Sequence, residues 1–376
     1  MEHLHRLLAE MVAATASDLH LKVGAPPLIR VDGTVRTTGA GPLAEAEVEG
    51  WVAGLLTGAQ RARLDSLRAV DLATTDPAGE RFRVVAFRQA GTPAFVFRHV
   101  LAQPPSLAEL ALPAVVESLC VPRAGLVVIT GATGSGKSTT LAAMVDHINH
   151  NNPLAITTLE DPVEILHHDA LGHITQREIG LDATSFATGV VEALRQDPDV
   201  ILIGELRDRE TITTAMLAAE TGHLVLTTLH TKEATETVQR ILATFPDDGR
   251  NGARVQLAAC LRAVVSQRLI PRAGGAGRVP ACEVMVVTDR IRDLIRRDLL
   301  HEIPDAIASG RTPYGMQNFD QALAELLAAG TITFDEALAH ATRPADFALR
   351  YRGIVSGGEE VERGHHAGRP QSRGRG

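Results

Sequence analysis

A glycine-rich run from Gly131 to Ser138 has the form G-x-x-x-x-G-K-S, which cradles phosphate groups when it joins a strand to a helix. Residues 126–130 have the pattern of a buried strand and residues 139–145 that of a helix. Backbone N–H groups of the turn and the positive end of the helix would hold the phosphates. Lys137 would reach the β- and γ-phosphates, and Ser138 would bind Mg²⁺. The sequence therefore predicts a nucleoside triphosphate site formed by Gly131, Thr133, Gly134, Ser135, Gly136, Lys137, Ser138 and Thr139.

Acidic residues follow two further buried-strand candidates, at 155–159 and 199–203. Glu160 ends the first of them and is expected to act as the base that positions the attacking water. Asp161 precedes a proline, so it could share in catalysis or cap a helix instead. Glu205 ends the second strand and is expected to hold Mg²⁺ or its water, although Gly204 stands where an Asp is usual.

Histidines and arginines supply further candidates for contact with the γ-phosphate. His223 and His230 bracket another strand candidate, and either could sense the phosphate through a hydrogen bond, although a histidine at a strand end is often structural. Arg81, Arg83 and Arg98 lie on strand candidates nearer the N-terminus. Each of these arginines alone fits a solvated surface charge, but in a ring one of them could stabilise transition-state charge in a neighbouring subunit.

The elements that must position these residues fall into two α/β domains. Residues 1–100 do not alternate strands and helices strictly, which predicts a mostly antiparallel sheet, with helices at 4–14, 45–56 and 59–67 and strands at 18–23, 28–36 (a hairpin around Asp32-Gly33), 81–88 and 94–98. Residues 101–112 are a linker. Residues 113–355 alternate strands and helices as a parallel sheet does, and become helical after about Pro271, at 289–300, 320–329 and 334–341. Residues 356–376 are expected to be disordered.

Composition excludes several classes of protein. The chain has 376 residues, 45% hydrophobic and 22% charged, which suits two globular domains. Its apolar runs are shorter than the roughly 18 residues of a membrane span, and its three cysteines form no CxxC pair. A net charge of −8 without a basic stripe argues against nucleic-acid binding. We expect a cytoplasmic protein.

Taken together, the motifs resemble those of the PilT-type twitching-motility ATPases of the type IV pilus, a family within the secretion ATPase superfamily. The similarity runs from about Ala16 to Tyr351. It rests on the glycine-rich loop, an "Asp box" at 160–164, an atypical Walker B at 204–205, a "His box" at 222–231, N-terminal signatures at 16–21 and 27–33, and C-terminal ones at 264–269 and 315–323.

This resemblance implies a PAS-like first domain, a RecA-like second domain with C-terminal helices, and a homohexamer that hydrolyses ATP with Mg²⁺ to drive pilus retraction. Glu160 would be the general base and Glu205 would serve Mg²⁺ and its water, while His223 and His230 would read the state of the nucleotide. The three arginines would contact nucleotide phosphates near a subunit interface: Arg81, Arg83 and Arg98. The implied partner is a pilus platform protein of the inner membrane, with membrane association only through partners, at the cytoplasmic face of that membrane.

The direction of the motor is a finer question. Residues 290–297 are similar to the AIRNLIRE helix of retraction ATPases, with departures at Arg290, Asp293 and Arg297. The chain also lacks the tetracysteine module and long N-terminal region that are usual in extension and secretion ATPases. We therefore favour a retraction motor. The alternatives are a pilus assembly or type II secretion ATPase of the same superfamily, or a non-catalytic nucleotide-binding accessory subunit.

Overall fold

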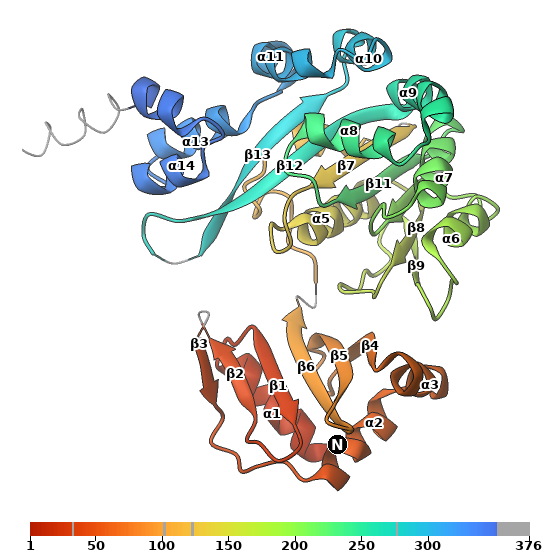
Figure 1. The fold of residues 1–376 in the computed structure, drawn as a ribbon, viewed down its shortest axis with the longest axis vertical. Helices are drawn as coiled ribbons and strands as arrows, with labels where there is room; N and C mark the ends of the chain where they lie inside the picture. The colour runs from red at the N-terminus through yellow and green to blue at the C-terminus, as the bar shows by residue number, and fades with distance from the viewer. Residues whose placement is uncertain (32–33, 101–102, 122–123, 276, 352–376) are drawn as a thin grey trace, which may run out of the picture. The chain divides into compact units, whose positions relative to one another are not determined.

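The computed structural model describes residues 1–31, 34–100, 103–121, 124–275 and 277–351 (Figure 1). The expected turn at Asp32-Gly33 and the expected disordered tail at 356–376 lie outside the described residues. Two compact units can be distinguished along the chain. One contains residues 1–105 and 148–204, and the other contains residues 106–147 and 205–376.

The N-terminal part of the first unit holds a six-stranded sheet in the order β3-β2-β1-β6-β5-β4, and every recorded pairing within it is antiparallel, which confirms the prediction. Its elements are α1 (Glu2–Ala13), β1 (Asp18–Lys22), β2 (Leu28–Val31), β3 (Thr34–Thr37), α2 (Glu45–Leu55), α3 (Gly58–Leu67), β4 (Ala69–Thr75), β5 (Arg81–Gln89) and β6 (Thr92–Val100). Strand β4 was not predicted, because its Ala and Asp residues are poor strand formers.

Alternation along β5 determines which of its side chains can reach other parts of the unit. Phe82, Val84 and Ala86 are buried in the core, while Arg81 and Arg83 are only partly buried. Because successive side chains of a strand point to opposite faces of the sheet, both arginines are directed away from this core.

The rest of the first unit consists of β8 (Ala155–Glu160), β9 (His173–Glu178), α6 (Phe186–Ala193) and β10 (Val200–Ile203), with β8 parallel to both other strands. Residues 161–172 contain no helix, so the interpretation of Asp161 as a helix cap is wrong. Side chains of β9 accept hydrogen bonds from backbone N–H groups of this segment instead. Glu178 accepts from Val163 N at 3.2 Å, and the Gln176 amide accepts from His167 N at 2.8 Å.

The second unit contains four strands in the order β13-β12-β7-β11. Its strands are β7 (Gly125–Thr130), β11 (Leu224–Leu229), β12 (Leu261–Pro271) and β13 (Arg278–Val286). Strand β7 is parallel to β11 and β12, whereas β13 is antiparallel to β12. The prediction that the chain is helical after about Pro271 is therefore wrong for β13. Most of β13 is buried, so it lacks the alternation that reveals a strand.

Helices surround these strands: α4 (Val115–Leu119), α5 (Lys137–Asn151), α7 (Arg209–Glu220), α8 (Ala234–Ala243), α9 (Asp247–Cys260), α10 (Asp289–Arg296), η1 (Leu300–Glu302), α11 (Ile303–Ser309), α12 (Arg311–Tyr314), α13 (Phe319–Ala328) and α14 (Phe334–His340). The predicted helix 289–300 ends earlier, at Arg296. Helices α13 and α14 share a core with β12 and β13 through Phe319, Leu323 and Ala337. Within the described part of the chain, no helix is both long and apolar enough to cross a bilayer.

A buried carboxylate lies on β13. Glu283 is 8% exposed, and its Oε1 accepts a hydrogen bond from Ala234 N, at the start of α8, at 2.7 Å. Burial raises the pKa of Glu283 to about 7; the Ala234 N–H and Arg268 oppose the rise, while Glu233 and Asp320 add to it. The folded protein therefore takes up a proton at this carboxyl at a higher pH than the unfolded chain does.

We expect Glu283→Gln to become more stable relative to the wild type as pH rises. Between pH 4.5 and about 7 the carboxyl is charged in the unfolded chain and neutral in the folded one, so wild-type stability falls over this range and stays low above it. A rise from 4.5 to about 7 corresponds to about 3 kcal/mol. Glutamine keeps the acceptor without the charge. Urea denaturation of both proteins at pH 5 and pH 8 measures the difference, and parallel pH dependences would contradict the expectation.

Candidate active site

The glycine-rich loop lies between β7 and α5, as predicted, and its glycines are required by its shape. At Gly131 (φ +141°) a Cβ atom would lie 2.5 Å from both the Gln267 carbonyl oxygen and the Ser135 hydroxyl. Gly134 and Gly136 also have positive φ angles, of +78° and +93°. Any larger residue at Gly131 would push the loop away from β12, because the carbonyl oxygen it meets belongs to the backbone.

Lys137 is the first residue of α5 and is only 8% exposed. Its Nζ donates to the carbonyl oxygens of Gly131 at 2.9 Å and Ala132 at 3.0 Å. Burial lowers the pKa of Lys137, and the charge of Glu205 opposes this. Ser138 in the next position is exposed, as is Thr133 in the loop. The helix N-terminus, the loop and one buried ammonium group are thus placed together.

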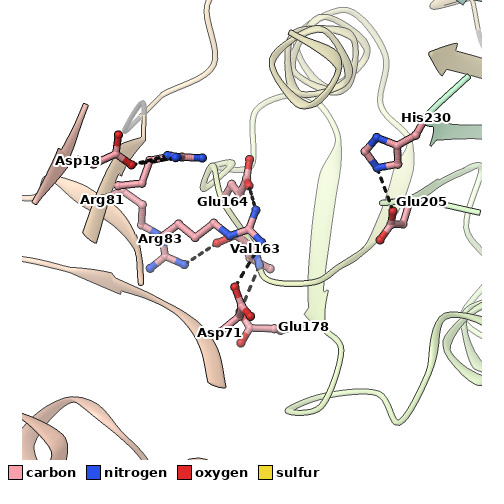
Figure 2. Close-up of polar contacts among 10 residues, drawn as sticks. Asp18, Asp71, Arg81, Arg83, Val163, Glu164, Glu178, Glu205 and His230 are labelled. Carbon is pink, nitrogen blue, oxygen red and sulfur yellow. Dashed lines mark hydrogen bonds and ion pairs between the residues drawn. The ribbon is translucent and has the colours of Figure 1, made fainter. Parts of the chain in front are cut away.

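The side chains of Glu205 and His230 are in contact in the second unit (Figure 2). Glu205 follows Gly204 directly, and His230 follows the last residue of β11. His230 Nε2 lies 3.3 Å from Glu205 Oε2, and Arg207 forms an ion pair with the other carboxylate oxygen. Glu205 is 16% exposed and His230 56%, so the pair combines a mostly buried acid with an accessible imidazole.

His223 lies at the opposite end of β11 from His230, so the structure does not bring the two histidines together. The six residues of β11 lie between them, so the two histidines are seven residue steps apart, about 23 Å at strand rise. His223 Nδ1 lies 2.9 Å from Ala218 O, and its own carbonyl accepts from Gly125 N at 3.0 Å. The first contact closes the turn after α7, and the second joins His223 to the start of β7. They give no support to the expectation that His223 reads the same nucleotide as His230.

Glu160 is the last residue of β8, in the first unit, and its carboxylate is held by donors from two strands. Thr158 Oγ1 donates to Oε1 at 2.8 Å, and Gln176 Nε2 donates to the same oxygen at 3.1 Å. Burial raises the pKa of Glu160, and these two donors oppose the rise. The result is a carboxylate of fixed orientation whose pKa lies above the ordinary value, as a general base requires.

Arg81 and Arg83 contact the segment that follows Glu160 (Figure 2). Arg81 Nη2 donates to Val163 O at 3.0 Å. Arg83 Nη1 donates to Glu164 Oε1 at 2.9 Å, and its Nη2 lies 3.4 Å from Asp71. Both arginines therefore contact the Asp box in the first unit.

Arg98 has a different partner. Its Nη2 lies 2.8 Å from Asp18 Oδ1, and the bond joins β6 to β1. Arg81 differs from it in being half buried: burial lowers its pKa, while the charges of Glu178 and Glu160 oppose this. The three arginines are thus not equivalent, since Arg81 and Arg83 contact the Asp box whereas Arg98 pairs with Asp18.

The polar residues that hold Glu160 and the glycine-rich loop in place were not predicted from the sequence. Gln176 and Thr158 fix Glu160, and Gln267 Nε2 donates to Thr140 Oγ1 at 2.9 Å beneath the glycine-rich loop. Gln267 and Thr140 are both buried. Strands β9 and β12 carry other polar and charged residues as well, so the sequence pattern did not set Gln176 and Gln267 apart.

A sheet with parallel central strands that carries a glycine-rich loop, a lysine and strand-end acids defines a RecA-like P-loop domain. The family described as "Type II/IV secretion system protein" matches residues 106–337, and the chain belongs to it.

Relatives of this chain are named as pilus ATPases. It is 42% identical to the "Type IV pilus retractation ATPase PilT" of Pseudomonas aeruginosa, over 91% of this chain and 98% of that protein. It is 39% identical to the "Type IV pilus ATPase PilU" of the same organism, over 96% and 93%. A crystal structure of the pilus retraction motor PilT with bound ADP superposes with a TM-score of 0.83 at 38% identity, covering 91% of this chain and 98% of that one.

Proposed function

We propose that this protein is an ATP-hydrolysing motor that drives type IV pilus retraction. The observation that carries the proposal is the loop with Lys137 and the Glu205–His230 pair in a chain 42% identical to almost the whole of a retraction ATPase. The arrangement of a cationic loop beside an acid and an imidazole suits phosphate binding and Mg²⁺ chemistry better than simple nucleotide storage.

In the proposed mechanism, backbone N–H groups of the loop and Lys137 hold the β- and γ-phosphates of ATP. The exposed Ser138 hydroxyl and the Glu205 carboxylate are oxygen donors of the kind that Mg²⁺ prefers, so they would hold the ion directly or through water. When bound, Mg²⁺ would neutralise charge on the phosphates. Glu160 accepts the proton of the attacking water, and His230 responds to the γ-phosphate through its contact with Glu205.

We further propose that the protein works as a homohexamer on a platform protein at the cytoplasmic face of the inner membrane. Arg81, Arg83 and Arg98 carry the positive charge that would contact nucleotide phosphates near a subunit interface. Arg81 and Arg83 already contact the segment after Glu160, which supports a role for them in timing hydrolysis. Sedimentation with and without ATP tests the hexamer.

Deletion of the gene separates the two directions in which such a motor could work. We expect the deletion strain to keep surface pili and to lose twitching motility, because assembly continues when retraction stops. Electron microscopy of pili together with a motility assay measures both properties, and complementation with the wild-type gene is the control. A strain without pili would instead support an assembly ATPase.

A further inference from the structure

The turn from His230 to Glu233, which joins β11 to α8, is fixed by side chains around it. Thr231 Oγ1 lies 2.7 Å from Thr237 Oγ1, and both hydroxyls are buried. Glu236 accepts from Lys232 N at 2.8 Å. The backbone that directs His230 towards Glu205 is therefore held in one conformation.

Arg268 on β12 joins this turn to the two C-terminal helices. Its guanidinium lies 3.7 Å from the centre of the Phe319 ring, at the start of α13. Its Nη1 donates to His340 O, at the end of α14, at 2.6 Å, and its Nη2 lies 3.5 Å from Glu233 Oε1. One side chain thus contacts α13, α14 and the turn that carries His230.

The neighbouring residue on β12 contacts the glycine-rich loop. Gln267 donates to Thr140 in α5, and its carbonyl oxygen lies against Gly131. Because successive side chains of a strand face opposite ways, Gln267 reaches the loop and Arg268 reaches the C-terminal helices. Strand β12 therefore contacts the glycine-rich loop on one face, through Gln267, and helices α13 and α14 on the other face, through Arg268.

The planar shape of its guanidinium makes Arg268 hard to replace. Burial lowers its pKa, and the carboxylates of Glu233, Glu283 and Asp320 oppose this. The planar guanidinium can stack on Phe319 and donate to His340 O and Glu233 at once, whereas an ammonium group cannot meet all three demands. A lysine at this position would keep the charge and lose part of these three contacts.

We propose that Arg268 is a positioning residue that couples helices α13 and α14 to the His230 turn and so sets the contact between His230 and Glu205. The inference rests on the proposed function, since it assigns a purpose to that contact in ATP hydrolysis. It adds the C-terminal helices to the set of elements on which turnover depends.

The test is a double-mutant cycle of Arg268→Lys and His230→Ala in the full-length protein, with ATP hydrolysis and fluorescent-ADP binding measured for each. We expect Arg268→Lys to lower kcat by about 10- to 100-fold with little change in KM or ADP affinity, as a misplaced group does. In the His230→Ala background the same change should add little, because residues acting as a unit are not additive. Arg254→Lys is the control, since Arg254 is a half-buried arginine that pairs with Asp298 at 3.1 Å elsewhere in the unit.

An equal fall in kcat in both backgrounds, or no fall in the wild-type background, would overturn the proposal. Should Arg268→Lys fail to fold, the same measurements are made on Phe319→Leu. This variant removes the ring that stacks on the guanidinium and keeps a buried apolar side chain. That variant must show the same fall in kcat and the same dependence on His230. Absence of hydrolysis by the wild type would contradict the proposed function, a result distinct from additivity in the cycle.

Discussion

Lys137→Ala is expected to bind ATP about 100-fold more weakly or worse, with its fold intact. Lys137 Nζ contacts carbonyl oxygens of the glycine-rich loop and is not part of an apolar core, so its loss should leave the fold intact. In the proposed site, removing this side chain would delete charge-assisted hydrogen bonds to two phosphates, each worth about 1.5–3 kcal/mol. Isothermal titration with ATP and Mg²⁺ measures the loss.

Lys22→Ala is the matched control, because it deletes an exposed lysine on β1. Circular dichroism and thermal melting should be the same for both variants and the wild type. Unchanged ATP affinity in Lys137→Ala would contradict the assignment of the glycine-rich loop as the nucleotide site.

Glu160→Gln is expected to bind ATP normally and to hydrolyse it about 100- to 10,000-fold more slowly, the range for loss of a general base. Thr158 and Gln176 donate to Glu160 Oε1, and the amide oxygen of glutamine can accept from the same donors. The variant therefore keeps the geometry and loses the proton acceptor. Phosphate release under single-turnover conditions measures the rate, with Glu192→Gln on α6 as the control.

The pH profile provides a second check on Glu160. Only the ionised carboxylate can accept a proton, so wild-type kcat should fall as pH drops through the pKa of Glu160, which burial raises. Thr158→Val removes a donor that stabilises the ionised form, so the acid limb should move to higher pH. An acid limb unmoved in that variant would argue against Glu160 as the base.

What the sequence could predict was largely local. The loop, its flanking strand and helix, and Glu205 after its strand depend on neighbours in the chain, and the structure places them as expected. His223 and His230 lie on either side of β11, as the sequence places them, but the separate contacts of the two side chains, with Ala218 and with Glu205, do not follow from spacing.

Long-range pairing escaped prediction for a different reason. Strand β13 is buried against β12 and α13, so its residues do not alternate between polar and apolar as those of a half-exposed strand do. Arg268 contacts residues far apart in sequence, Glu233 and His340 among them, and no spacing rule connects these. Arg81 and Arg83 were recognisable as exposed-face arginines, whereas their contacts with the Asp box depend on how distant segments meet.

The three cysteines are all buried, and burial raises the pKa of each thiol to about 12: Cys120, Cys260 and Cys282. Because the thiolate is the reactive form, thiol reagents have almost nothing to attack in the folded second unit. A cysteine introduced on α14 can therefore carry a fluorophore without competing labels. The native thiols then act as reporters of local opening, each at its own position: the end of α4, the end of α9 and the middle of β13.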